Sequence, residues 1–368
     1  MTIVPVRSAA ELKRFIRVPA RLYAGDPHFV PQLEMERSDA LTARNPYFEH
    51  AEAQYFLAVR DGRDVGRISA QIDQLVTDKT LGQFGLIVAE DNPDTFRALF
   101  AAAEGWLRER GRMRVQGPFN LTINEETGLL IDGFNTPPMV FMSHDPPFTG
   151  ARIEEQGYGK AKDLFAYHYS VDKGLPATLM RMIERYKPKG MTVRPLDLKN
   201  YDKEFDLVID IFNDAWSQNW GFVPFTEAEL KHTAKGLKPL LDPGLTAIVE
   251  MNGVPVAFGI TLPNLNEIIR DFKGKLFPFN WIKLLLRLKR AKTARCLLMG
   301  VRRNFNAGLA TGLVPVLLIK CMREGALQRS IKHVELSWIL EDNRPMRRII
   351  EAMGSEHYKT YRVYEKTL

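Results

Sequence analysis

An internal repeat is the feature that most limits how this chain of 368 residues can fold. The segment Ile153–Gly157 aligns with Ile350–Gly354 at an offset of 197 residues, and the same offset pairs Tyr167 with Tyr364. In each copy a short predicted helix ends at the glycine, a residue that readily adopts the left-handed conformation after a helix. Such self-similarity at a fixed spacing indicates a duplicated structural unit.

The elements predicted upstream of these segments recur in the same order. In the first copy they are a hairpin turning at Asp61-Gly62, a strand at 82–88, a helix at 93–110 and a strand at 113–116. In the second copy they are a hairpin turning at Asn252-Gly253, a strand at 294–301, a helix at 310–328 and a strand at 333–339. Asp-Gly and Asn-Gly favour two-residue hairpin turns. Strands rich in Val, Ile and Leu need cover on both faces, so each unit is predicted to be a mixed α/β sheet with packed helices.

A polar stretch divides the two predicted units. It spans 176–190 and separates an N-terminal domain at 1–175 from a C-terminal domain at 191–368. The C-terminal domain carries an extra segment at 272–295, where the first copy has only 73–81. Both predicted domains have an ordinary size for an independent fold.

The composition narrows the cellular setting. Hydrophobic residues make up 45% and charged residues 26%, as in ordinary globular proteins. No apolar run approaches the roughly 18 residues that a membrane span needs, and the first residues lack the apolar core of a signal peptide. Only two cysteines are present, Cys296 and Cys321, without metal-ligand spacing. These features predict a protein of the reducing cytoplasm that holds no metal.

Positive charge gathers in one region. The net charge is +7, yet 272–323 contains 12 Lys or Arg and no Asp or Glu. Such a block favours an anionic partner, either a phosphorylated cofactor or a lipid surface, while no nucleic-acid-binding motif is recognised. Within it, 277–295 reads as a basic amphipathic helix with Trp281 among leucines, typical of helices that lie on anionic membranes. The alternative is a helix that packs on its own sheet and exposes its basic face.

The C-terminal copy resembles the GNAT N-acyltransferase superfamily. Asn343, Met346, Ile350 and Gly354 match the superfamily's spacing along its fourth helix. The segment 297–301 resembles the splayed central strand that binds pantetheine, and 307–312 stands where the pyrophosphate loop is expected. Two positions depart from the pattern: Phe305 replaces the basic or amide residue that begins the loop, and Ile350 replaces the general-acid tyrosine.

Motifs along nearly the whole chain are similar to one bacterial tandem GNAT family. They are 117–120, 124–130, 219–224 and 337–343. Some members resemble bacterial ceramide synthases, which acylate the amine of a sphingoid base. This resemblance implies two tandem GNAT-like domains and an acyl thioester donor, with CoA and acyl carrier protein both open as carrier.

The resemblance also assigns the donor site. Backbone N–H groups of Met299, Gly300 and Val301 are expected to bind the thioester, with a plain buried strand as the alternative. Small residues before a helix let backbone amides approach a pyrophosphate, with a helix-capping turn as the alternative. The residues expected in that loop are Gly308, Ala310, Thr311 and Gly312.

Three residues are candidates for the chemistry. Glu335 lies in an apolar strand, where burial would raise the pKa of a carboxylate base, but alternation also permits a solvent-facing side chain. Tyr361 is a candidate general acid, with packing as the alternative. Asn343 resembles the residue that binds the cofactor's amide arm, or it caps the next helix. The expected substrate channel comprises Asn120, Asn124, Glu125, Trp220 and Trp338.

Together these features favour an N-acyltransferase that acylates a long-chain, sphingoid-type amine. The N-terminal copy is expected to be degenerate and to shape the acceptor channel, and the basic segment to contact the inner membrane peripherally. Two alternatives stay open: a soluble acetyl-CoA-dependent N-acetyltransferase acting on a small amine or peptide, and a non-catalytic module that binds lipid or cofactor.

Overall fold

The computed structural model describes residues 1–305 and 308–368. The chain forms two compact units. Unit 1 comprises Met1–Leu164, Ile269–Leu284 and Lys359–Leu368, and unit 2 comprises Phe165–Ile268 and Leu285–Tyr358. No helix in these described ranges is long and apolar enough to cross a membrane.

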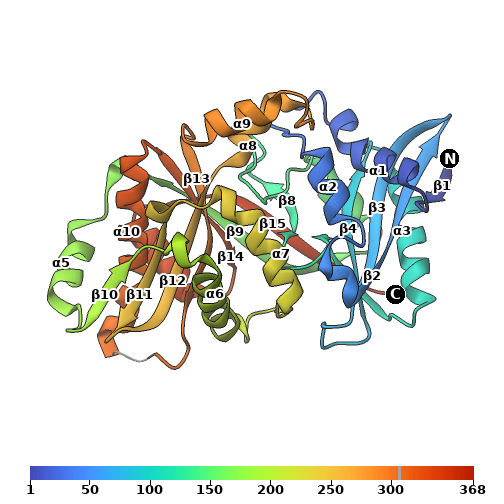
Figure 1. Ribbon diagram of the computed structural model, residues 1–368. Helices are drawn as coiled ribbons and strands as arrows, with labels where there is room; N and C mark the ends of the chain where they lie inside the picture. Colours follow the sequence, from blue (N-terminus) through green and yellow to red (C-terminus); the bar gives the residue numbers. More distant parts are fainter. Residues whose placement is uncertain (306–307) are drawn as a thin grey trace. The chain divides into compact units, whose positions relative to one another are not determined.

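Unit 1 contains a mixed sheet with helices packed on it (Figure 1). Its strands run in the order β1-β2-β3-β4-β5-β15. The strands are β1 (Thr2–Pro5), β2 (Ala51–Arg60), β3 (Arg63–Asp73), β4 (Leu81–Ala89), β5 (Arg114–Gly117), the short β6 (Phe119–Asn120), β7 (Glu126–Thr127) and β8 (Leu129–Asp132), and β15 (Glu356–Thr367). The helices are α1 (Ala9–Leu22), α2 (Glu34–Ala40), α3 (Pro93–Arg108) and α4 (Phe148–Glu154).

Unit 2 repeats this arrangement. Its strands run in the order β10-β11-β12-β13-β14-β9. The strands are β9 (Gly159–Ser170), β10 (Met191–Arg194), β11 (Thr246–Met251), β12 (Val254–Pro263), β13 (Thr293–Val301) and β14 (His333–Leu340). The helices are α5 (Ala177–Tyr186), α6 (Tyr201–Trp216), α7 (Glu227–Leu237), α8 (Leu265–Ile269), α10 (Val314–Gln328) and α11 (Arg344–Ala352). Helix α9 (Asn280–Leu288) begins in unit 1 and ends in unit 2.

The two predicted hairpins are present with the expected turns. Asp61 and Gly62 have φ values of 50° and 74°, and Asn252 and Gly253 have 52° and 80°. Two successive positive φ values define the turn type whose twist matches that of paired strands. In both units the strand after the hairpin pairs in parallel with the next strand, β4 with β5 and β13 with β14. The predicted order of elements is therefore confirmed in each copy.

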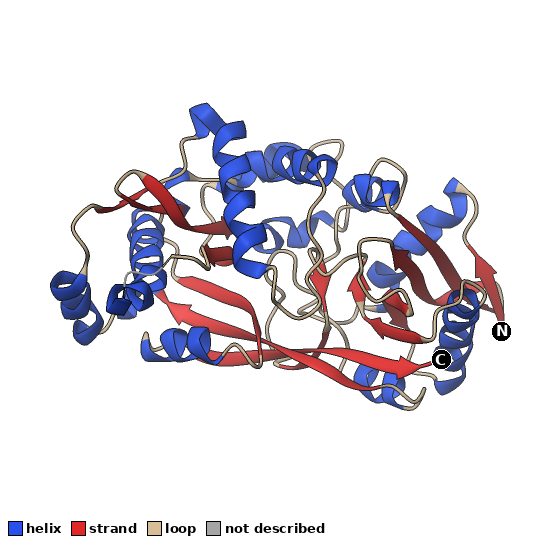
Figure 2. Ribbon diagram, turned by 90° about the horizontal axis from the view of Figure 1, so that it is seen from below, coloured by secondary structure: helices blue, strands red, loops and turns tan. Residues whose placement is uncertain are grey.

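The helices cover the sheets with the faces that their sequences predict. In α3, Phe96, Leu99 and Phe100 are fully buried against the sheet of unit 1. In unit 2, α10 packs on β11 and β12 (Figure 1) and contributes most of its apolar residues to the core. Figure 2 shows the helices and strands of the chain from below. The glycines Gly157 and Gly354, which follow α4 and α11, have φ values of 85° and 82°. The left-handed helix ends predicted from the repeat are thus present.

The compact units differ from the sequence-based division in two places. The last ten residues, Lys359–Leu368, belong to unit 1, where Tyr364 of β15 pairs with Gly117 of β5. The expected linker at 176–190 carries α5 and lies within unit 2. As evolutionary repeats, the ranges 1–175 and 191–368 stay a prediction.

Candidate functional site

The two parallel strands of unit 2 separate halfway along their length. Their pairing begins at Thr293 and His333 and ends at Cys296 and Leu336, although both strands continue. At this point β13 carries an extra residue, Leu297, where its register with β12 shifts. Such a bulge bends a strand away from its neighbour. The backbone of β13 beyond Leu297 therefore turns an edge toward the gap.

A cavity of about 90 Å³ occupies this gap. It is lined by β13, β14, α10, α11 and the end of α6. The lining residues used below are Trp216, Met299, Ser337, Trp338, Asn343 and Ile350. Of the three residues predicted to bind the thioester, only Met299 is among the described lining residues of the cavity. Met299, Gly300 and Val301 all pair with β12, opposite Gly259, Phe258 and Ala257.

Tryptophans form one wall of the cavity. The rings of Trp216 and Trp338 lie 5.9 Å apart at 60°, and Phe212 extends the stack 4.7 Å from Trp216. The Trp216 indole N–H donates to the Met299 carbonyl at 3.4 Å. Trp338 was predicted here, while the predicted Trp220 is not among the lining residues in the described part of the chain.

Glu335 lies behind the cavity wall in a buried polar network. Its side chain is fully buried, so the solvent-facing alternative is wrong. Ser337 donates to Oε1 at 2.5 Å, and the Tyr358 hydroxyl donates to Oε2. Arg295, also buried, donates from Nε to Ser337 Oγ at 2.8 Å and lies 3.7 Å from the Glu335 carboxylate. Only Ser337 of these residues lines the cavity.

Asn343 caps α11 and also lines the cavity. Its side-chain oxygen accepts the Met346 N–H at 3.3 Å and so caps α11, as the capping alternative predicted. The same residue lines the cavity. Ile350, at the place of the superfamily's general-acid tyrosine, is buried and lines the cavity with an apolar side chain. The described wall thus offers no hydroxyl at that position.

The predicted pyrophosphate loop is described in part. Residues 306–307 lie outside the described ranges, and 308–313 form a 3-10 turn that leads into α10. Gly308 has a φ of 61°, which disfavours other residues. A Cβ added at Gly308 or Gly312 would meet no described atom within 4 Å. Phe305, the departure from the superfamily pattern, packs against the core of unit 2.

The corresponding gap in unit 1 is filled by the chain itself. The pairing of β4 with β5 ends at Gln83 and Gln116, and the strands then separate as in unit 2. Here β6 returns onto β4: the Leu86 N–H donates to the Asn120 side-chain oxygen at 2.7 Å. A Cβ on Gly85 would lie 1.7 Å from the Phe119 carbonyl oxygen, so the fit admits only glycine.

The other predicted acceptor residues form a polar group in unit 1. Glu126 accepts from Gln32 and, at 2.9 Å, from the Asn120 amide. Asn124 and Glu125 precede it, both half-buried. Burial raises the pKa of Glu125 to about 7. A carboxyl group that changes charge near neutral pH is a plausible acid or base.

Tyr361 belongs to a different unit from Glu335 and Asn343. Its ring is fully buried in unit 1, beside Gly128, where an added Cβ would lie 3.1 Å from Tyr361 Cβ. Tyr358, three residues earlier, belongs to unit 2 and contacts Glu335.

Two bacterial proteins are similar in sequence to this chain over nearly its whole length. The chain is 52% identical over 375 residues to the bacterial ceramide synthase of Caulobacter vibrioides, covering 100% of this chain and 98% of that protein. It is 43% identical over 364 residues to protein YghO of Escherichia coli, covering 97% and 93%. The chain belongs to the family of these two proteins. No family model matches it.

Solved structures share its fold. A tandem GNAT protein from the clavulanic acid biosynthesis pathway matches with a TM-score of 0.62 at 15% identity, covering 100% of this chain and 98% of that one. A GCN5-related N-acetyltransferase from Sphaerobacter thermophilus matches with 0.55 at 14% identity, covering 99% and 95%. The predicted tandem GNAT architecture is confirmed, and this member of the ceramide synthase–YghO family is an acyltransferase.

Sequence reasoning missed four residues of the site. Trp216 and Ser337 line the cavity, and Arg295 and Tyr358 hold Glu335. One signal for Arg295 was present: it is a charged residue within the otherwise apolar run 294–301. Trp216 gave none, since its helix reads as an ordinary amphipathic segment and only the tertiary fold brings it to β13.

Proposed function

We propose that this protein transfers a fatty acyl group from a thioester to the amine of a long-chain base, as a step of bacterial sphingolipid synthesis. The observation that carries the proposal is the separation of β13 from β14, which opens an aromatic-walled cavity beside the backbone of β13 at Met299. The 52% identity to a protein called bacterial ceramide synthase supports the acceptor class. The donor is a phosphopantetheine thioester, a group that CoA and acyl carrier protein share.

The reaction follows from the chemistry of thioesters. The neutral amine attacks the carbonyl carbon, and the carbonyl oxygen becomes an oxyanion that N–H groups of β13 near Met299 stabilise. The carbon–sulfur bond then breaks, the thiolate leaves and takes up a proton, and the amine nitrogen loses one to give the amide. The turn at 308–313 at the start of α10 is the proposed place of the donor's pyrophosphate.

Glu335 is proposed to act through Ser337. A base must come within hydrogen-bond reach of the proton it removes, and Ser337, not Glu335, lines the cavity. The Ser337 hydroxyl bonds to Glu335 and is oriented by Arg295. Asn343 is the proposed contact for the donor's amide arm. Tyr361 as general acid, like Trp220 in the channel, stays a prediction.

Unit 1 is proposed to hold no thioester. The place that a donor would take along β4 is occupied by Phe119 and Asn120 of the same unit. Asn124 and Glu125 are instead proposed to contribute to acceptor binding, because the raised pKa of Glu125 lets it accept a proton near pH 7. Gln or Ala at Glu125 should then raise the KM for the amine and leave the KM for the donor unchanged.

The size of the cavity favours a second candidate, an acetyltransferase. A dry cavity of about 150 Å³ holds one benzene molecule, so 90 Å³ holds only a short acyl group. A fatty chain must therefore displace the Trp216 ring or extend outward. Turnover of acetyl, octanoyl and palmitoyl thioesters of CoA and of acyl carrier protein, with sphinganine or a small amine, decides between the candidates. Turnover with acetyl-CoA alone would refute the proposed fatty acyl donor.

A peripheral membrane contact is proposed through 277–286. The apolar stripe of α9 faces outward: Trp281, Ile282, Leu285 and Leu286 are 43%, 42%, 61% and 66% exposed. Arg287 turns inward and donates to the Ile268 carbonyl at 3.1 Å. This is the reverse of a helix that packs its apolar face on its own sheet. Exposed aromatic and leucine side chains with flanking lysines suit an anionic bilayer surface.

Vesicle co-sedimentation at low and high salt tests this contact. Changing the exposed residues Lys283, Lys289 and Arg290 to Glu should abolish binding to anionic vesicles. The matched control changes Lys199, Lys203 and Lys235, which are exposed on unit 2, to Glu. Wild-type protein that stays in the supernatant with every lipid composition would refute the membrane contact and leave the acyl transfer proposal standing.

A further inference from the structure

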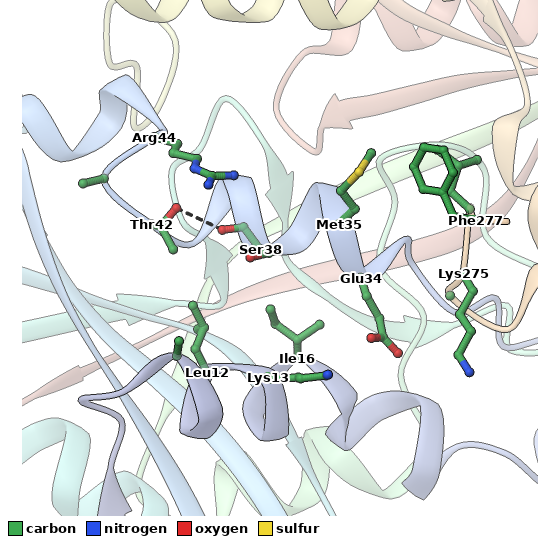
Figure 3. Close-up of a pocket in the computed structure, with 14 residues that line it drawn as sticks. Leu12, Lys13, Ile16, Glu34, Met35, Ser38, Thr42, Arg44, Lys275 and Phe277 are labelled. Atoms are coloured by element: carbon green, nitrogen blue, oxygen red, sulfur yellow. Dashed lines mark hydrogen bonds between the residues drawn. The ribbon is translucent and has the colours of Figure 1, made fainter. Parts of the chain in front are cut away.

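Unit 1 contains a groove of about 820 Å³ that the acyl transfer does not use. Its walls are α1, α2 and the segment 274–277 (Figure 3). Leu12 and Ile16 rise from α1 toward α2, and the Phe277 ring stands at one end (Figure 3). The volume falls within the range of about 300–1,000 Å³ that is usual for small-molecule sites.

The sequence builds this groove in a defined way. Helix α1 places Phe15 and Val18 in the core, which leaves Leu12 and Ile16 half-buried on the side of α2. The segment 274–277 is tied to the start of α2, because the Glu34 N–H donates to the Gly274 carbonyl at 2.9 Å. Gly274 has a φ of 75°, and an added Cβ would lie 3.1 Å from the Gln32 carbonyl oxygen.

The rim of the groove carries uncompensated positive charge. Lys13 and Lys275 are exposed, and neither has an ion-pair partner among residues 1–305 and 308–368. The acidic lining residue, Glu34, is already held by Arg17 through two hydrogen bonds of 3.0 and 2.8 Å. A cationic amine would be repelled here, whereas a phosphate would be attracted.

The groove is also continuous with the exposed apolar segment. Phe277 lines it and is 61% exposed, and Phe279 and Trp281 follow at 71% and 43%. We infer that the groove binds one anionic phospholipid molecule, with an acyl chain along Leu12 and Ile16. Its phosphate lies at the rim, where Lys13 and Lys275 stand on either side of the Glu34 carboxylate that Arg17 already holds (Figure 3). This inference goes beyond the acyl transfer and does not depend on which amine is acylated.

Calorimetric titration of the full chain with dihexanoyl phosphatidylglycerol, below its micelle concentration, tests the inference. Because this probe is monomeric, no bilayer is present for α9 to bind. Dihexanoyl phosphatidylcholine and glycerol 3-phosphate test the contributions of charge and chain. We expect the phosphatidylglycerol to bind more tightly than either. The K13E/K275E variant should bind it at least about 30-fold more weakly, while the exposed control K203E/K235E should match the wild type.

A second variant tests the chain subsite. Ser38 lines the groove on α2, and S38W should fill it and abolish binding, whereas S38T should retain it. Circular dichroism reports whether S38W folds. If it does not fold, the affinity of K13E/K275E alone tests whether the groove binds the phospholipid. Equal affinity for the two lipids, tight binding of glycerol 3-phosphate, or unchanged affinity in K13E/K275E would overturn the inference. Acyl transfer to a water-soluble amine, measured on the same samples, shows separately whether the proposed function fails.

Discussion

Replacing Glu335 by Gln should destabilise the protein strongly, because it removes the counter-charge of a buried guanidinium. Glu335 is 0% exposed and Arg295 3% exposed, with 3.7 Å between Nε and Oε1. Breaking a buried pair by neutralising one partner costs about 3–5 kcal/mol, whereas replacing both partners by apolar residues is often close to neutral. E335Q and R295M should therefore each lower the free energy of unfolding by about 3–5 kcal/mol, and R295M/E335M by much less than their sum.

Urea unfolding followed by circular dichroism measures these free energies at pH 7. The control is E227Q, which removes an exposed ion pair with Lys231 and should leave the free energy of unfolding nearly unchanged. Turnover is then measured at a temperature at which every variant is folded, together with S337A. A relay through Ser337 predicts that S337A loses turnover while keeping most of its stability. An E335Q protein that unfolds at the wild-type urea concentration would refute the buried-pair reasoning.

Three further changes have outcomes fixed by local geometry. G308D should weaken donor binding, because it places a carboxylate at the proposed pyrophosphate turn; an unchanged KM for the donor would move the site elsewhere. Burial raises the pKa of Asp145 to about 7, so the stability that its protonated form contributes is present below pH 4 and is lost as pH rises toward 7. Urea unfolding should therefore show that D145N is more stable than the wild type at pH 8, by up to about 4 kcal/mol. At pH 4 the variant should show no gain. G85A should prevent unit 1 from folding, because the added Cβ would collide with the Phe119 carbonyl oxygen. The control G105A, whose Cβ would meet nothing within 4 Å, should raise the temperature of thermal unfolding.

The local signals in the sequence predicted the elements well. Asp61-Gly62 and Asn252-Gly253 favour the hairpin turn that needs positive φ at both positions, and the apolar spacing of α3 can be read within the helix itself. What could not be predicted depends on pairing between distant segments. The repeat marks Tyr364 as equivalent to Tyr167, yet nothing local states that β15 completes the sheet of unit 1.

Contacts between distant segments also determine the chemical roles of single residues, which the sequence alone could not predict. For Glu335 the sequence left burial and exposure as alternatives, and the structure shows the side chain buried. Its neighbours Arg295 and Tyr358 come from other strands, and they determine that the buried carboxylate is hydrogen-bonded and paired. Tyr361 follows the three-residue spacing of the tyrosines in β15, and the division of that strand between the units separates it from Tyr358. Spacing along a strand gives the face of a residue, not the sheet in which that face lies.

The connection that follows the second parallel strand accounts for the difference between the two copies. In unit 2, β14 passes to α11 through 341–343 alone, a connection too short to return onto the edge of β13. In unit 1, β5 passes to α4 through 118–147, and the start of this longer segment lies in the gap as β6, with Asn120 bonded to Leu86. The Asn120 side chain there accepts the Leu86 N–H at the strand edge, whereas in unit 2 we propose that the donor thioester binds at this place. The duplicated fold thus keeps its strand separation in both units, while the length of one connection decides which of them retains a cavity.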